Sequence, residues 1–346
     1  MSATSVLELI GGLLSYFERT YAQLFFSFSP FLSIPSMLAA LLVAYAVVRL
    51  ERTGARRRIK LKVLIRAFFP RYLFSSPSTR ADAGMFILNT SVFTVLLGYA
   101  ILSTTVVAAL LRGQLIGIFG EPSPAPLTPL QMSLIMTLCL FFAYELSYYT
   151  DHYLSHKIPF LWEFHKVHHA AEILTPLTNF RVHPVDTVVF YNITALMMGG
   201  TMGSLNYLFG TTANQFLLAN SNIILVLFIY FIGHLQHSHF WIVFTGNWGR
   251  FFLSPAHHQI HHSANPLHFD RNFGHCLGIF DWLFGTLHMP ASKREKLTFG
   301  VDPKPAAPHS MSEMLVAPFG NALAQLAPTH DVNQNHSEVR TEPMTR

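Results

Sequence analysis

The amino-acid sequence contains several apolar runs long enough to cross a lipid bilayer. Residues 31–50, 85–111 and 129–149 each come close to the roughly 20 consecutive apolar residues that a transmembrane helix needs. Only 12% of the 346 residues are charged, about half the share that is usual in soluble globular proteins. Because hydrocarbon excludes charge from the helices it surrounds, these features predict an integral-membrane, all-α helical bundle.

Apolar segments elsewhere in the chain complete the predicted bundle. Residues 186–208 and 213–233 are joined by a short turn with glycine and asparagine, and we expect a helical hairpin whose glycine-rich first arm is a candidate re-entrant helix. Residues 1–30 carry two glutamates and an arginine among apolar residues, which favours an interfacial helix over a poorly spanning one. The sequence thus predicts about four spans plus interfacial or re-entrant helices.

The positive charge of the chain is concentrated in one connecting segment. Ten of the 23 Lys and Arg residues fall between Arg49 and Arg80, directly after the first apolar run. An excess of Lys and Arg marks cytoplasmic loops, so the net charge of +5 indicates a membrane flank and not a nucleic-acid partner. Counting the spans from this segment places residues 151–185 and 234–299, which hold most of the histidines, together on the cytoplasmic face.

Histidine is the residue that most clearly marks a functional site. None of the 19 histidines precedes His152, and sixteen lie between His152 and His288. Many are three or four residues apart, a spacing that puts side chains on one face of a helix. The clusters are His152 with His156; His165 with His168 and His169; His234 with His237 and His239; and His257 and His258 with His261 and His262.

This number of imidazoles favours a site for two metal ions. Neutral imidazole binds zinc, copper, iron and nickel, and eight or more imidazoles exceed what one ion accepts. The HExxH pattern of zinc metalloproteases is absent. A zinc-dependent membrane hydrolase and a metal-transporting or haem-binding membrane protein remain as alternatives, which metal analysis and haem absorbance would separate.

Three histidine motifs, taken in order, resemble those of a known family. Residues 152–156 resemble its HxxxH box, and residues 165–169 and 258–262 resemble its HxxHH boxes. Residues 272–286, which read Asn-Phe-Gly-His and later Phe-Gly-Thr, are similar to its closing motif. Over residues 129–288 the chain therefore resembles the fatty acid hydroxylase/sterol desaturase superfamily of membrane oxygenases.

The resemblance implies a di-iron site that uses O2 and an external electron donor, such as a ferredoxin or a cytochrome b5-like protein. It implies hydroxylation of a C–H bond in a membrane lipid, with desaturation of the lipid as the alternative reaction. Carried over box by box, it makes nine histidines metal ligands: His152, His156, His165, His168, His169, His237, His258, His261 and His262. The middle box is irregular, so His234 and His239 are further candidates there, and His183 is a candidate because its His-Pro sequence resembles an element of several family branches.

Other residues are expected to support the ligands without binding metal themselves. A metal-bound histidine usually donates its second ring nitrogen to a carboxylate or carbonyl group. Glu145 lies two helical turns before His152 on the same helix face, in a span where a charge is costly. The candidates for this supporting role are Glu145, Asp281, His257 and His275, with Asp151 and Asp186 as weaker ones.

The sequence also suggests how the chain is divided. The predicted parts are an N-terminal helix at residues 1–30, membrane spans with the basic loop at 31–128, a catalytic domain at 129–299, and a loosely ordered tail at 300–346.

Overall fold

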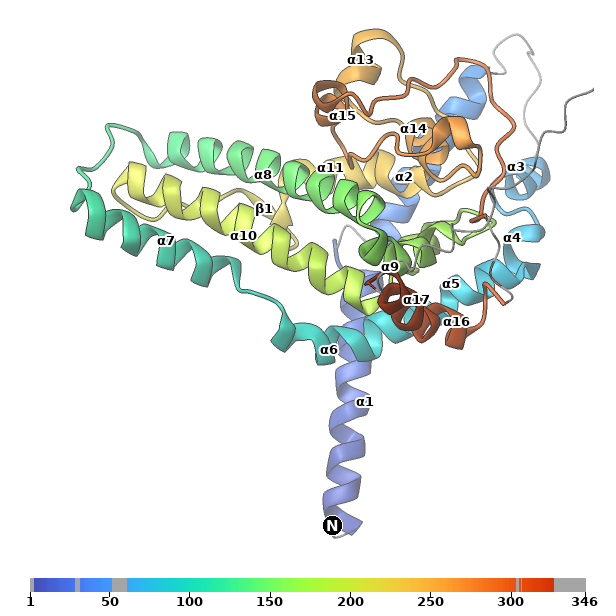
Figure 1. The fold of residues 1–346 in the computed structure, drawn as a ribbon, viewed down its shortest axis with the longest axis horizontal. Helices are drawn as coiled ribbons and strands as arrows, with labels where there is room; N and C mark the ends of the chain where they lie inside the picture. Colours follow the sequence, from blue (N-terminus) through green and yellow to red (C-terminus); the bar gives the residue numbers. More distant parts are fainter. Residues whose placement is uncertain (1–2, 29–31, 52–60, 303–304, 306, 327–346) are drawn as a thin grey trace, which may run out of the picture.

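The fold is almost entirely helical (Figure 1). A computed structural model describes residues 3–28, 32–51, 61–302, 305 and 307–326. Within these residues, three helical segments are long and apolar enough to cross a membrane: Pro77–Phe119, Pro129–Lys157 and Pro184–Phe209. The segments Ile34–Leu50 and Ile223–Gln236 are apolar but shorter. The predicted helical membrane fold is confirmed, with three candidate spans where about four were expected.

Three long helices lie side by side and form an elongated arm (Figure 1): α7 (Thr104–Phe119), α8 (Pro129–Lys157) and α10 (Pro184–Phe209). Small residues allow α10 to approach α7 closely. A Cβ added at Gly199 would lie 2.6 Å from the Cβ of Val107, and one added at Gly203 would lie 2.5 Å from the carbonyl oxygen of Ala108. Such close packing through small residues is typical of helices in membranes.

The predicted span at residues 85–111 is not one regular helix. Helix α5 (Pro77–Leu88) runs through a π-helical turn into the short α6 (Thr94–Leu97), and α7 begins only after Ser103, whose side chain caps it. Asn89, in the π-helical turn, donates hydrogen bonds to the carbonyl groups of Phe180 and Val182. The interruption therefore anchors this segment to the chain just before α10.

The second arm of the predicted hairpin starts later than expected. Helix α10 ends at Gly210, which has a left-handed backbone with φ of 69°. Two short strands follow, β1 (Leu217–Leu218) and β2 (Ser221–Asn222), joined through Ala219 and Asn220 with positive φ. Asn222 then caps α11 (Ile223–Phe228), so the predicted start at residue 213 is wrong because a loop and the hairpin of β1 and β2 occupy residues 213–222.

Part of the C-terminal tail is ordered, contrary to the prediction. Two helices, α16 (Met311–Leu315) and α17 (Ala317–Leu326), pack on α5 and on α9 (Pro159–His169). Met314 is buried against Met85 and Val167, and the fully buried Arg181 donates a hydrogen bond to the carbonyl of Pro308. Residues 327–346 lie outside the described part, so the prediction for them has no structural counterpart.

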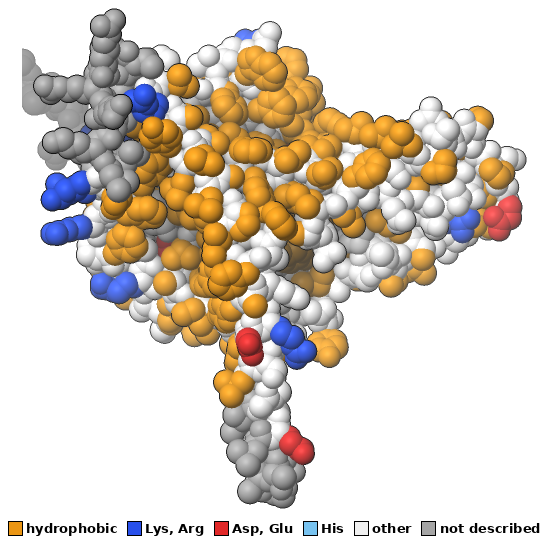
Figure 2. Space-filling model, turned by 180° about the vertical axis from the view of Figure 1, so that it is seen from behind, with side chains coloured by type: hydrophobic (Ala, Val, Ile, Leu, Met, Phe, Trp, Pro, Cys, Tyr) orange, Lys and Arg blue, Asp and Glu red, His pale blue; other side chains and the backbone are white. Residues whose placement is uncertain are grey.

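The N-terminal helices lie at the edge of this assembly. Helix α1 (Ala3–Phe26) leaves the body in a direction across that of the long arm (Figure 1), and α2 (Ile34–Glu51) packs beside the π-helical turn Ile229–Gly233. Short helices α3 (Leu61–Phe68) and α4 (Tyr72–Ser75) follow. Figure 2 shows apolar side chains spread over the face seen from behind, with several of the Lys and Arg side chains at one edge. Such a broad apolar surface fits contact with lipid.

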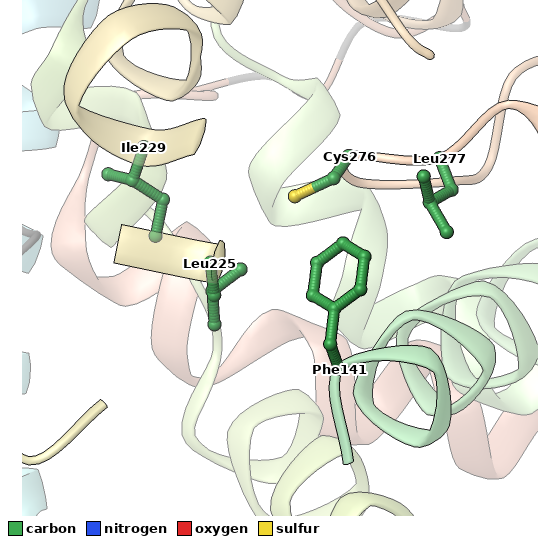
Figure 3. Packing of buried hydrophobic residues seen from close by; sticks show 5 residues of the cluster. All are labelled: Phe141, Leu225, Ile229, Cys276 and Leu277. Atoms are coloured by element: carbon green, nitrogen blue, oxygen red, sulfur yellow. The ribbon is translucent and has the colours of Figure 1, made fainter. Parts of the chain in front are cut away.

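The histidine-rich segments form a cap at one end of the long arm. Besides α9, the cap contains α12 (His234–Gln236), α13 (Gly246–Phe251), α14 (Pro255–His261) and α15 (Ile279–Phe284). The loop before α15 is held on α8 and α11 by a buried cluster in which Phe141 and Leu225 face Cys276 and Leu277 (Figure 3). This cluster joins the cap to the membrane helices.

Candidate metal centre

Four helices bring the nine predicted ligands into one buried region. His152 and His156 lie in the last turns of α8, and α9 carries the three histidines that end in His169. His237 follows the last residue of α12, and the remaining three histidines lie on α14 and at its end. The structure thus brings together segments that are far apart in the sequence and sorts the nine histidines into two groups.

The first group contains five histidines: His152, His156, His165, His169 and His261. One ring nitrogen from each lies within 4.8 Å of those of the others. The Nε2 atom of His169 is central, at 3.1 Å from the Nε2 atoms of both His156 and His261. We call this set the five-histidine group.

Three outer ring nitrogens of the five-histidine group have partners that fix their rings. His152 Nδ1 donates to the carbonyl of Phe273 at 2.8 Å, and His261 Nδ1 donates to the carbonyl of Arg271 at 2.7 Å. His165 Nδ1 lies 3.0 Å from the carboxylate of Asp186. With the hydrogen on Nδ1, the lone pair of Nε2 points into the group, which is the tautomer that a metal ligand needs.

The second group, which we call the four-histidine group, contains His168, His237, His258 and His262. Its Nε2 atoms are close together: His237 Nε2 lies 3.3 Å from that of His168, 3.0 Å from that of His262 and 2.9 Å from that of His258. All four side chains are buried. Their Nδ1 atoms have no hydrogen-bond partner in the described part of the chain.

Each group fits a metal ion. Nitrogens that bind one ion at about 2.0–2.1 Å lie about 3 Å apart when they subtend a right angle at it, close to the spacing observed here. Without a metal ion, burying converging nitrogens that make few hydrogen bonds costs folding free energy. Burial lowers the pKa of His237 and of His261 to about 3, and lowers the pKa of His168 and His262 well below the usual range. The imidazoles are therefore neutral, which is the metal-binding form.

Neighbouring histidines in the sequence belong to different groups. His168 joins the four-histidine group and His169 joins the five-histidine group; His262 and His261 divide in the same way. Adjacent residues on a helix point in directions about 100° apart, because a turn takes 3.6 residues. Each HxxHH motif therefore links the two groups through its own backbone.

The three less certain ligand candidates lie outside both groups. His183 caps α10, with Nδ1 accepting from the backbone N–H of Val185 and Nε2 facing the carbonyl of Leu315. His234 Nε2 lies 3.0 Å from the hydroxyl of Ser36 on α2. His239 packs against the ring of Phe240. The three residues therefore make capping, hydrogen-bonding and packing contacts, and none belongs to either histidine group.

The predicted supporting residues act on the backbone more than on the ligands. Asp281 accepts hydrogen bonds from the N–H groups of Phe273 and Gly274, and so holds the carbonyl that receives His152. Burial raises the pKa of Asp281 to about 6. Glu145 accepts from the N–H groups of Cys276 and Leu277 and contacts His275, away from the nine ligands. The carboxylate that contacts a predicted ligand directly, at His165 Nδ1, belongs to Asp186, one of the weaker candidates in the sequence.

His257 has a local structural role. Its Nδ1 lies 2.7 Å from the hydroxyl and 3.1 Å from the N–H of Ser254, completing a capping box at the start of α14. Burial lowers its pKa to about 3. Its contact with Ser254 helps to fix the start of the helix that carries His258 and His261.

Comparisons with known proteins cover the part of the chain that holds these histidines. Residues 137–286 match the fatty acid hydroxylase family, and this stretch contains all nine histidines of the two groups. The alkylglycerol monooxygenase of Danio rerio is 26% identical over 172 residues, which are 46% of this chain and 32% of that protein. The ornithine lipid hydroxylase OlsE of Rhizobium tropici is 29% identical over 149 residues, 42% of this chain and 40% of that protein. The match thus spans less than half the length of either relative, and no solved structure is significantly similar to the chain.

Proposed function

We propose that this chain is a membrane-bound di-iron oxygenase that hydroxylates a C–H bond of a lipid, because residues 137–286 match the fatty acid hydroxylase family. The observation that carries the proposal is the division of nine converging imidazoles into two adjoining groups. Two irons held there would supply activation of O2 and attack on an unactivated C–H bond, chemistry that no protein side chain provides.

The residues of the chain would hold and shield such a centre. We assign His152, His156, His165, His169 and His261 to one iron and His168, His237, His258 and His262 to the other. Phe273, with no exposed surface, packs against the rings of His152 and His156 and helps to exclude water from the five-histidine group. Exclusion of water protects reactive species from side reactions.

The substrate and the electron donor belong to the same proposal. The relatives act, by their names, on alkylglycerols and on ornithine lipids, which supports a membrane lipid as substrate. Electrons would come from a ferredoxin or a cytochrome b5-like protein, because the sequence has no dinucleotide-binding glycine motif. The basic segment between Arg49 and Arg80 favours a cytoplasmic cap, where such a carrier would dock.

Metal analysis and lipid analysis test the proposed function together. Purified protein should contain two irons per chain, and cells that express the chain should accumulate a lipid heavier by one oxygen than its precursor. A lipid that has lost two hydrogens would make the chain a desaturase. A single zinc without any lipid oxidation would identify a hydrolase, and an intense Soret band would identify a haem protein; either result would refute the proposal.

A further inference from the structure

One histidine of the cap lies among aromatic side chains between α8, α10 and α11. The ring of His275 is 4.9 Å from that of Tyr148, 6.1 Å from that of Tyr144 and 5.6 Å from that of Phe228, measured between centroids. Phe190 of α10 packs edge-on against both tyrosines. These side chains are partly exposed, so the cluster reaches the surface of the molecule where the membrane helices meet the cap.

A buried carboxylate sets the orientation of His275. Glu145 is fully buried, and its Oε2 accepts two backbone hydrogen bonds of 2.8 Å from Cys276 and Leu277. Its Oε1 lies 3.4 Å from His275 Nδ1. His275 Nδ1 also lies 3.2 Å from Cys276 Sγ. A carboxylate oxygen accepts hydrogen bonds, so the tautomer that matches the contact with Glu145 carries its hydrogen on Nδ1. In the neutral ring, Nε2 then keeps its lone pair and can accept a hydrogen bond from another molecule.

The same residues are poorly suited to a third metal ion, although Glu145, His275 and Cys276 lie close enough together to hold one. One carboxylate oxygen of Glu145 is already occupied by two backbone N–H groups. Burial raises the pKa of the Cys276 thiol well above its usual range, and the neighbouring Glu145 adds to this effect. The thiol therefore stays protonated, whereas a metal needs the thiolate.

Three hydrogen-bonding atoms in this aromatic cluster have no hydrogen bond in the described part of the chain: the hydroxyls of Tyr144 and Tyr148, and Nε2 of His275. Polar atoms in apolar surroundings are stabilised when a partner is supplied. The hydroxyls can donate and the imidazole nitrogen can accept. The ring of Tyr148 is also 5.5 Å from that of His152, so this set adjoins the five-histidine group.

We propose that Tyr144, Tyr148 and His275 bind the polar group of the lipid substrate, and that this group is a hydroxyl or a secondary amide, each of which both donates and accepts hydrogen bonds. The proposal rests on the lipid-oxygenase function proposed above. The ring of Tyr148 contacts the rings of both His275 and His152. Oxygen is therefore inserted at a carbon near the polar group and not at the far end of the alkyl chain.

The test is equilibrium binding to the full-length, metal-loaded protein in detergent, which needs no electron donor. The probes are 1-O-hexadecylglycerol as a hydroxyl source, an ornithine lipid as an amide source, and hexadecane, which has no polar group. Tyr148→Phe and His275→Leu should each weaken binding of at least one polar probe about three- to tenfold, the effect of one hydrogen bond, and leave hexadecane unchanged. His275→Gln, whose side-chain oxygen can accept in place of Nε2, should restore most of the affinity.

Tyr99→Phe is the matched control, because Tyr99 is 99% exposed. A loss of affinity confined to the alkylglycerol identifies a hydroxyl, and a loss confined to the ornithine lipid identifies an amide. Unchanged affinity for both polar probes in Tyr148→Phe and His275→Leu would overturn the subsite, as would a wild-type protein that binds neither. Different results would refute the proposed function: cells that express the unmodified chain form no oxygenated lipid, or the purified protein lacks iron.

Discussion

The two histidine groups differ in what holds their rings. In the five-histidine group, His152, His165 and His261 each have an Nδ1 partner, which is a backbone carbonyl or the carboxylate of Asp186. In the four-histidine group, none of the four Nδ1 atoms has a hydrogen bond in the described part of the chain. One group is therefore oriented by hydrogen bonds from outside, and the other by packing and by contacts among its own nitrogens.

This difference indicates how each group should respond to damage. Hydrogen bonds to Nδ1 orient a ligand ring and make it a better donor to the metal. The five-histidine group has these bonds and one additional imidazole, so it should tolerate the loss of one ligand better. The four-histidine group should depend more on the ion itself for its order.

Loss of a ligand should have the largest effect. His168→Ala leaves the four-histidine group with three imidazoles, so we expect about one iron per chain and no measurable lipid oxidation. His156→Ala leaves four imidazoles in its group and should retain more iron. Metal analysis of the purified variants measures both, with His239→Ala as a control outside the groups. Equal iron loss in the two ligand variants would contradict the proposed difference.

Removal of a supporting carboxylate should act mainly on one group. Asp186→Asn replaces the carboxylate beside His165 Nδ1 with a neutral amide, and we expect iron affinity to fall about 10- to 100-fold in the five-histidine group and less in the four-histidine group. Competition with a graded series of chelators would resolve one weakened and one normal site. Asp270 lies at the surface, 3.7 Å from His156 Nδ1, so Asp270→Asn should weaken iron binding in the same group by less. Equal weakening of both sites would contradict the assignment of Asp186 to the five-histidine group.

Acid should destabilise the metal-free protein through both groups. His237 and His261 have pKa values of about 3 in the fold because they are buried, against about 6.5 in an unfolded chain. Between these values the unfolded chain binds protons that the folded chain does not, so stability falls as pH falls. Each histidine should cost about 2 kcal/mol at about pH 5.

The measurement is the Tm of chelator-treated protein at about pH 7.5 and about pH 5. His237→Gln should reduce the fall in Tm. His257 has a similarly low pKa but lies outside both groups, so its contribution should persist when iron is restored. A Tm that does not change with pH would rule out neutral, buried ligand histidines.

A more distant support should have the smallest effect. Asp281→Asn keeps one acceptor for the backbone at Phe273 and Gly274 but loses the other. The loss of about one hydrogen bond should weaken iron binding in the five-histidine group by about two- to tenfold. Thr286→Val removes the hydroxyl that donates to Asp281 and should have a similar, small effect. Weakening of the four-histidine group alone would contradict this connection.

The sequence predicts the ligands better than their division. Eight of the nine histidines lie in motifs whose members are three or four residues apart and so share a helix face, and the family resemblance selected the full set. Whether His168 and His169 serve the same ion depends on how α9 is placed against α14, and that is a tertiary contact which no spacing specifies. The two groups could therefore be identified only from the structure.

The supporting contacts were less predictable for another reason. Two of the three Nδ1 partners are the carbonyls of Phe273 and Arg271, and backbone atoms have no signature in a sequence. Glu145 was predicted to support a ligand because it is a charged residue in a membrane span, yet its contacts are with residues 275–277. The signal for Asp186 was its place in the first turn of α10, close after His183.

The adjacent pairs His168–His169 and His261–His262 have a thermodynamic consequence. Each pair is two residues of one backbone, so ordering a ring for one ion also restricts the ring that serves the other. The first ion therefore bears most of the entropic cost of arranging both groups, and the second should bind more tightly. With half the required iron, we expect native mass spectrometry to find mainly empty and fully loaded chains.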